Sequence, residues 1–129
     1  MRRFVSVLVA ACALSAAACT DNNSITSPTV DIVGNWNLRS LNGSPLPYNL
    51  GNRAIVNEQL SLNNDGTYTD VATYSDGNFF NEFGYYSVNN NVVTFQDQTD
   101  QITYTGSISG SVLTEIDNNT GFTSVYQKQ

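Results

Sequence analysis

The stretch AIVNEQLSLNNDGTYTDVATYSDGNFFNEFGYYSV, residues 54–88, decides the fold class. Two turn clusters, at 63–66 and 75–78, separate three runs that are rich in Val, Thr, Tyr and Phe. Gly adopts positive φ angles without steric cost, and Asn and Asp tolerate them, so these clusters are typical of tight turns. Because β-branched and aromatic residues favour strands, the stretch predicts three antiparallel strands in succession.

The same punctuation continues outward in both directions. It predicts eight strands, at 32–41, 54–62, 67–75, 79–88, 92–97, 101–108, 111–117 and 122–128. Only the first connection, 42–53, is long, and its Pro45 and Pro47 disfavour a strand interior. Short loops join antiparallel neighbours, so we expect an all-β, up-and-down meander. Closure into a barrel removes both exposed edges, and a two-sheet β-sandwich is the alternative.

Alternation of apolar and polar residues predicts which side chains face the core. Trp36 and Leu38 share one face of the first strand. In the second strand, Val56 and Leu60 share a face with Glu58. These strands are therefore expected to be half-buried.

The fourth predicted strand has aromatic residues on both faces. Phe83 and Tyr85 lie on one face, and Phe80 and Tyr86 lie on the other. Gly84 is a candidate for a β-bulge that switches the faces. We expect Phe83 and Tyr85 to point into the barrel.

The N-terminus has the features of an export signal. Arg2 and Arg3 precede an apolar segment, 4–13, that is too short to span a bilayer. Small residues then run into Cys19, which resembles the bacterial lipobox, although Ala16 stands where Leu is usual. The resemblance implies that Cys19 is lipidated and becomes the first residue after cleavage.

These features predict three segments: a lipoprotein signal peptide at 1–18, a lipidated Cys with a flexible tether at 19–31, and the barrel at 32–129. Cleavage before Cys12 is one alternative. Another is an ordinary signal that leaves Cys19 as a free thiol.

The expected location is the cell envelope. A bacterial lipidated Cys carries several acyl chains, enough for stable membrane anchoring. Thr20 is not the Asp that retains lipoproteins at the inner membrane, which favours the outer membrane. The predicted domain has no Cys, so it has no disulfide.

Charge excludes one class of partner. The chain carries a net charge of −6, and without Arg2 and Arg3 only Arg39, Arg53 and Lys128 oppose its 11 acidic residues, a net charge of −8. Because nucleic-acid binding depends on Lys and Arg at phosphates, we expect no such partner. Acidity instead favours a soluble, monomeric domain.

The strand pattern also resembles small bacterial lipocalin-like domains. Gly34-Asn35-Trp36 occupies the place of the Gly-x-Trp that opens lipocalins. Segments 38–47, 60–68, 84–95 and 125–128 resemble their later elements in order and spacing. The resemblance implies a barrel with Trp36 at its floor and a ligand in its mouth. We expect the long connection 42–53 to act as a lid over that ligand. The chain lacks the C-terminal helix and disulfides of typical lipocalins.

The candidate ligand-binding residues are mostly aromatic side chains on expected inward faces: Trp36, Tyr68, Tyr74, Phe83, Tyr85 and Tyr104, joined by Glu58 and Asp70. Such aromatics can line an apolar pocket or fill a small barrel. Unpaired buried carboxylates are costly, so Glu58 and Asp70 indicate either polar groups in a cavity or a face open to water.

Little in the sequence points to catalysis. The chain has no His, which excludes catalytic triads and Cys-His pairs that need a His, as well as metal sites with a His ligand. The pairs Asp65/Asp70 and Asp97/Asp100 could do acid–base work or bind Ca²⁺, but acids are common at turns. We expect no enzymatic activity, cofactor or metal.

Two functions remain. The first is a membrane-anchored protein that binds a small, mostly apolar molecule. The second is a structural or interaction lipoprotein with a filled core, whose loops contact protein or polysaccharide.

Overall fold

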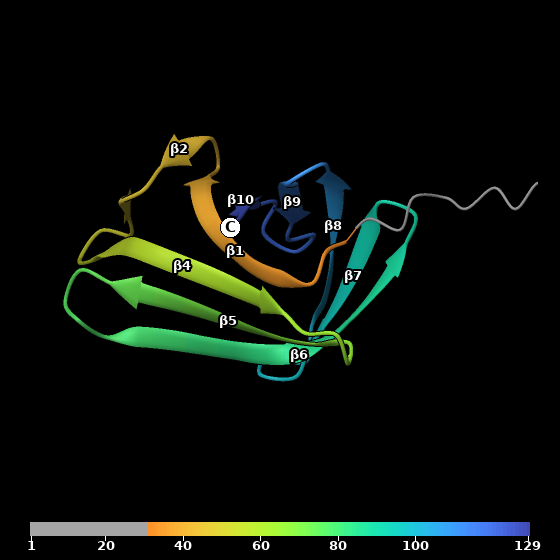
Figure 1. Cartoon of the computed structure of the whole chain (residues 1–129). Helices are drawn as coiled ribbons and strands as arrows, with labels where there is room; N and C mark the ends of the chain where they lie inside the picture. The colour runs from red at the N-terminus through yellow and green to blue at the C-terminus, as the bar shows by residue number, and fades with distance from the viewer. Residues whose placement is uncertain (1–30) are drawn as a thin grey trace, which may run out of the picture.

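The computed structural model describes residues 31–129, which form β-strands and no helix (Figure 1). The strands are β1 (Gly34–Leu41), β2 (Ser44–Pro45), β3 (Tyr48–Asn49), β4 (Ala54–Leu62), β5 (Thr67–Tyr74), β6 (Phe79–Asn89), β7 (Val92–Asp97), β8 (Thr103–Ser109), β9 (Val112–Ile116) and β10 (Thr123–Lys128). The expected signal peptide, Cys19 and nearly all of the tether lie outside the described residues. In residues 31–129, no helix is long and apolar enough to cross a membrane.

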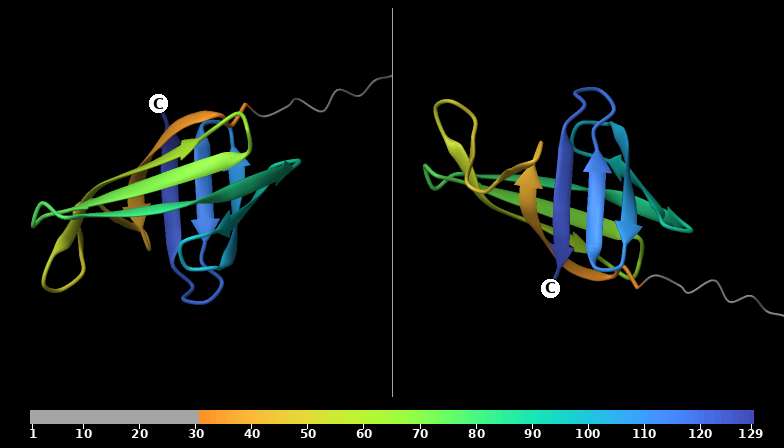
Figure 2. Two further views of the ribbon diagram at one scale, coloured as in Figure 1. Left: turned by 90° about the horizontal axis from the view of Figure 1, so that it is seen from below. Right: turned by 90° about the horizontal axis from the view of Figure 1, so that it is seen from above.

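Eight long strands close into an antiparallel barrel. Each of β4 to β9 pairs with the next strand along the chain, and β1 pairs with both β10 and β4. The closing register places Trp36 opposite Leu60 on one side and opposite Lys128 on the other. In Figure 2, β8, β9 and β10 (blue) run across β4, β5 and β6 (green). The predicted up-and-down barrel is confirmed, and the sandwich alternative is wrong.

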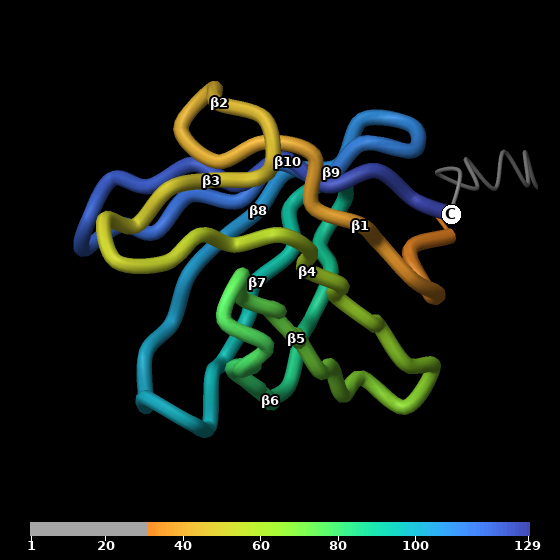
Figure 3. The backbone as a smooth tube through the Cα atoms, turned by 90° about the vertical axis from the view of Figure 1, so that its left-hand side faces the viewer, coloured from red at the N-terminus to blue at the C-terminus, as the bar shows by residue number. Residues whose placement is uncertain are grey.

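The long connection 42–53 is tied to the barrel by two short strands. β2 pairs with the end of β1 through a two-residue turn in which Asn42 and Gly43 have φ angles of 49° and 76°. Positive φ at both positions suits the twist of a hairpin. β3 pairs with the start of β4. The connection therefore lies at the end of the barrel toward the viewer in Figure 3 (yellow).

Two register shifts alter the expected faces. The pairing of β1 with β10 shifts between Leu38 and Ser40, and the pairing of β4 with β5 shifts between Ile55 and Asn57. A bulge adds one residue and reverses the alternation. Ile55 is therefore buried, whereas Val56, which was expected to face inward, is 43% exposed.

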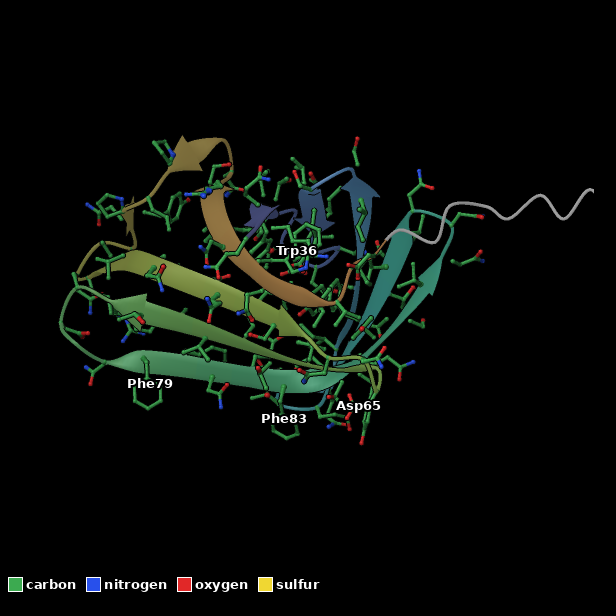
Figure 4. The ribbon with its side chains drawn as sticks, viewed as in Figure 1. Trp36, Asp65, Phe79 and Phe83 are labelled. Atoms are coloured by element: carbon green, nitrogen blue, oxygen red, sulfur yellow. The ribbon has the colours of Figure 1, made fainter. Side chains whose placement is uncertain are left out.

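β6 keeps its register, so Gly84 marks no bulge. A Cβ atom at Gly84 would lie 2.1 Å from the carbonyl oxygen of Gln96 and 2.8 Å from Cε1 of Tyr68, so this position requires Gly. The alternation consequently continues through Gly84. Phe83 and Tyr85 are 54% and 55% exposed on the outer face, and the expectation that they point inward is wrong. Figure 4 shows Phe83 pointing away from the barrel.

The core is densest at the end of the barrel that holds Trp36, and it continues along β1 and β4 to Leu41 and Ile55. Its fully buried members include Leu60, Leu62, Val93 and Leu113, packed with Trp36. The Trp36 indole Nε1 donates a hydrogen bond of 2.9 Å to the Ile32 carbonyl oxygen, which satisfies its only polar atom. Trp36 is thus fully buried inside the barrel, where Figure 4 labels it, and its position is consistent with the packing role that the resemblance implied.

Candidate functional site

A cavity of about 330 Å³ lies at the end of the barrel opposite Trp36. Its lining comes from inward positions along the strands and from the turns at that end: Glu58, Asp70, Glu82, Ile102, Tyr104, Glu115, Asp117, Thr120, Phe122, Ser124 and Tyr126. A second hollow of about 170 Å³ shares Glu58, Asp70 and Glu82 with it. The same strands therefore build a packed floor at one end and a cavity at the other.

Four of the five carboxyl groups that line this cavity lie on strands, and we call these four the acidic cluster; the fifth, Asp117, lies at a turn. Glu58 comes from β4, Asp70 from β5, Glu82 from β6 and Glu115 from β9. They include all three Glu residues of the chain. Each occupies an inward position of its strand, and closure of the barrel brings the four strands to one space.

Tyr126 joins two members of the cluster. Its hydroxyl lies 2.5 Å from Oε1 of Glu58 and 3.1 Å from Oδ2 of Asp70. A phenol carries one proton, so it donates to only one acceptor. The shorter contact is the donation to Glu58, and the longer contact becomes a hydrogen bond when a protonated Asp70 donates to Tyr126.

Glu82 is held by two other tyrosines. The hydroxyl groups of Tyr68 and Tyr104 both donate to its Oε1, at 2.8 Å and 2.5 Å. The rings of these tyrosines pack on Phe95, Tyr104 in a stack and Tyr68 edge-on. The aromatic layer between floor and cavity thus fixes the orientation of Glu82.

Among the buried side-chain atoms of residues 31–129, two carboxylate oxygens have no hydrogen-bond partner: Oδ1 of Asp70 and Oε1 of Glu115. Glu115 is only 6% exposed. Burying a polar atom without a partner costs on the order of 1–3 kcal/mol. This end of the barrel therefore holds acceptors whose hydrogen bonds are not supplied by the protein.

No basic residue lines the cavity among the described residues. Arg53 instead lies 3.9 Å from Asp76 and stacks over the Tyr74 ring, with its Cζ 3.7 Å from the centroid. Lys128 pairs with Asp31 at 3.3 Å. The acidic cluster is therefore not neutralised by a nearby cation of the protein.

Burial raises the pKa of all four carboxyl groups. For Asp70 and Glu115 the pKa is raised well above its usual range, first by desolvation and then by the neighbouring carboxylates. Desolvation also raises the pKa of Glu58 and of Glu82, although tyrosine hydrogen bonds partly offset it. The cluster consequently retains protons more readily than exposed acids do.

The structure brings together some of the expected site residues and separates others. Glu58, Asp70 and Tyr104 line the main cavity, Tyr74 lines the smaller hollow, and Tyr68 reaches Glu82 from below. Trp36 lies in the packed floor, and Phe83 and Tyr85 are on the outer surface.

Among the lining residues that were not identified from the sequence are Glu82, Glu115 and Tyr126. Glu82 has the same parity as Tyr86, and Glu115 the same parity as the core residue Leu113. That parity was the available signal. In the fourth predicted strand it was obscured by aromatics on both faces.

The acids at the turns have a different role. The Asp65 carboxylate accepts hydrogen bonds from the Thr67 backbone and hydroxyl, at 3.0 Å and 2.6 Å. Asp97 likewise accepts from the backbone of Thr99 and Asp100. These are turn contacts of the kind expected for Asp. Asp65 lies at an exposed turn (Figure 4), away from Asp70 inside the barrel.

The connection 42–53 supplies none of the lining residues of the cavity. It reaches the rim through Tyr48, whose ring packs edge-on against Phe122 at a centroid distance of 6.5 Å. Phe122 itself lines the cavity. The segment 42–53, which was expected to cover the ligand as a lid, therefore lies beside the opening of the cavity and does not line it.

Two crystal structures resemble this barrel. One is of a lipocalin-like protein from Bacteroides uniformis, with 17% sequence identity and a TM-score of 0.51 over 75% of this chain and 97% of that chain. The other is of an uncharacterized protein from Bacteroides eggerthii, with 12% identity and the same TM-score over 75% of this chain and 98% of that one. The sequence matches no family model and no curated protein. The chain thus has a lipocalin-like fold.

Proposed function

We propose that this chain is a lipid-anchored protein of the cell envelope whose barrel binds a small molecule in the cavity. The observation that carries the proposal is the cavity itself. Its volume of about 330 Å³ falls within the range of small-molecule sites, about 300–1,000 Å³. The lipocalin-like fold supports the same role.

The lining indicates a ligand with two kinds of surface. Ile102, Tyr104 and Phe122 offer apolar or aromatic contacts, and the acidic cluster offers hydrogen-bond acceptors. A purely apolar molecule would leave those acceptors unpaired. We therefore propose a partly polar ligand in place of the mostly apolar one expected from the aromatic sequence.

The proposed anchor is the lipid on Cys19, followed by the polar tether to about Asp31. The outer membrane is the proposed location, and the domain is proposed to act as a monomer without catalysis. The barrel edges support a monomer because β1 pairs on both sides within the chain.

Native mass spectrometry tests both parts of the proposal. The chain would be purified from membranes of its source bacterium in a nonionic detergent and measured intact. We expect added acyl mass that is lost with Cys19→Ala, and a noncovalent small molecule that leaves at higher collision energy. An unlipidated chain would contradict the anchor. A chain that carries and takes up no small molecule from a cell extract would contradict the binding role.

A second candidate is an interaction lipoprotein, favoured by the outer face of β6. Phe79, Phe83 and Tyr85 are 71%, 54% and 55% exposed there. A photo-crosslinking amino acid at Phe83 would then capture one defined envelope partner, whereas the same group at Thr94 on β7 would not. Equal labelling at both positions would contradict this candidate.

A further inference from the structure

The cavity presents hydrogen-bond acceptors in excess of donors. The tyrosine hydroxyls of Tyr104 and Tyr126 are already used, since they donate to Glu82 and Glu58. Oδ1 of Asp70 and Oε1 of Glu115 accept nothing. A ligand that fits this lining must therefore bring donors of its own.

Glu115 provides the observation that separates this site from an ordinary acidic patch. Its side chain lines the cavity, and its Oε1 has no hydrogen-bond partner. The residue is 6% exposed and therefore 94% buried. An acid at an exposed turn would be solvated by water. Here the carboxyl group is enclosed beside three others, and no Lys or Arg of residues 31–129 lines the space.

We propose that the cavity binds an organic ammonium ion, whose charged group contacts Asp70 and Glu115 and whose apolar part lies against Ile102, Tyr104 and Phe122. This proposal rests on the proposed binding function and names the chemical class of the ligand. A primary ammonium carries three donors and no acceptor, which complements the unpaired acceptors of the lining.

The aromatic rings at the mouth favour the same class. The faces of Tyr and Phe rings attract cations, and burial strengthens this attraction. Tyr104 and Phe122 both line the cavity. An ammonium ion with a short apolar body can contact the rings and the carboxylates together.

A divalent metal ion fits the site less well. In residues 31–129, no group of three or more acidic side chains is arranged to hold a metal ion. Two of the carboxyl groups, Glu58 and Glu82, are engaged by tyrosine donors. Ca²⁺ takes six to eight oxygen ligands, more than the remaining groups present.

Binding of a cation should also release protons. The carboxyl groups that face the cavity are Glu58, Asp70, Glu82, Glu115 and Asp117, and no basic group faces them among the described residues. An ammonium ion stabilises the charged form of the buried acids, so bound protons leave as it enters.

The test is calorimetric titration of the membrane-purified full chain in nonionic detergent at pH 7.5. The probes are phenethylammonium, the neutral 3-phenylpropan-1-ol and the anionic 3-phenylpropionate. We expect one-to-one binding of the ammonium at least tenfold tighter than that of the alcohol. Its enthalpy should change with the ionisation enthalpy of the buffer, which reports proton release.

Glu115→Gln should weaken the ammonium at least tenfold and leave the affinity for the alcohol unchanged or higher. Asp31→Asn is the matched control, because it also removes one negative charge but lies near the other end of the barrel, beside Lys128. It should change the ammonium affinity less than twofold. Unchanged melting temperatures, or higher ones, would show that the variants fold.

The outcomes separate this proposal from the binding function. The ammonium proposal would be overturned if the alcohol and the ammonium bound with equal affinity and Glu115→Gln had no effect. The chain would then be a binding protein for neutral molecules. Tight Ca²⁺ binding that excludes the ammonium would also overturn it. If no probe binds and no molecule is taken up from extract, both proposals fail.

Discussion

The two ends of the barrel are built from the same eight strands but have opposite chemistry. At the closed end, Trp36, Leu60 and Leu113 are fully buried, and the only polar atom of Trp36 is paired. At the open end, inward positions of the same strands carry carboxyl groups, two of whose oxygens are unpaired. One end therefore supplies stability, and the other gives up stability for a polar cavity.

This contrast separates packing from function within one small domain. A buried apolar side chain stabilises by its contacts and its removal from water. A buried acid without a partner destabilises. The contrast predicts that substitutions at the two ends change the free energy of unfolding in opposite directions.

The largest effect is expected at the floor. Trp36→Ala should lower the free energy of unfolding by about 3–5 kcal/mol, because it removes a fully buried ring and leaves a cavity. Urea unfolding measures this change. Phe83→Ala, which removes an exposed aromatic side chain, is the control and should change stability by less than about 0.5 kcal/mol. Similar losses in both variants would remove the distinction between floor and outer face.

The next largest loss of stability is expected at Gly84, between the two ends of the barrel. Gly84→Ala places a Cβ atom 2.1 Å from the Gln96 carbonyl oxygen, so β6 or β7 must shift. Overpacking of this kind costs about 1–3 kcal/mol. Thermal unfolding checks it, with Ser87→Ala on the outer face of the same strand as the control. A neutral Gly84→Ala would show that these strands separate easily.

At the open end, a substitution should raise the free energy of unfolding instead of lowering it. Glu115→Gln should raise the free energy of unfolding at pH 8 by about 1–3 kcal/mol, because it removes a buried carboxyl group whose charged form is disfavoured by burial and whose Oε1 has no partner. Chemical unfolding at pH 8 and pH 5 measures the change. The gain should shrink at pH 5, because the raised pKa of Glu115 favours its neutral form as the pH falls. A loss of stability at pH 8 would mean that Glu115 has a stabilising contact.

The pH dependence of the wild-type chain follows from the same groups. The folded-state pKa values of Asp70 and Glu115 are raised, so the folded state binds more protons and stability falls as the pH rises above about 4, the usual value for such acids. Hydrogen bonds lower the pKa of Asp65, Asp76 and Asp117, whose stabilisation is lost below about pH 4. Melting temperatures should therefore peak at mildly acidic pH. A maximum near pH 8 would contradict this.

The smallest effect is expected at the tyrosine that bridges the cluster. Tyr126→Phe removes the hydroxyl that donates to Glu58 while keeping the buried ring. The loss of one hydrogen bond to a buried acid should cost about 1–2 kcal/mol and raise the pKa of Glu58 further. Unfolding at pH 8 and carboxyl titration by NMR measure the two changes. An unchanged pKa of Glu58 would show that the Tyr126 hydroxyl does not stabilise the charged form of the Glu58 carboxyl group.

Local sequence predicted the strands well because turn residues mark strand ends directly. The prediction 54–62 is the observed β4, and 92–97 is the observed β7. Face assignment succeeded where the alternation was clean. It failed at Val56, where a bulge intervenes, and at Phe83, where both faces carry aromatics.

The sequence by itself determined an acidic all-β chain with one long connection, and it pointed to Glu58 and Asp70 as carboxyl groups among apolar neighbours. Only the tertiary structure decided that they meet Glu82, Glu115 and Tyr126 in one cavity. The physical reason is closure: Glu58 and Tyr126 are 68 residues apart, and their contact depends on the registers of every strand between them. Alternation assigns a side chain to a face, whereas the closed barrel decides which faces share a space.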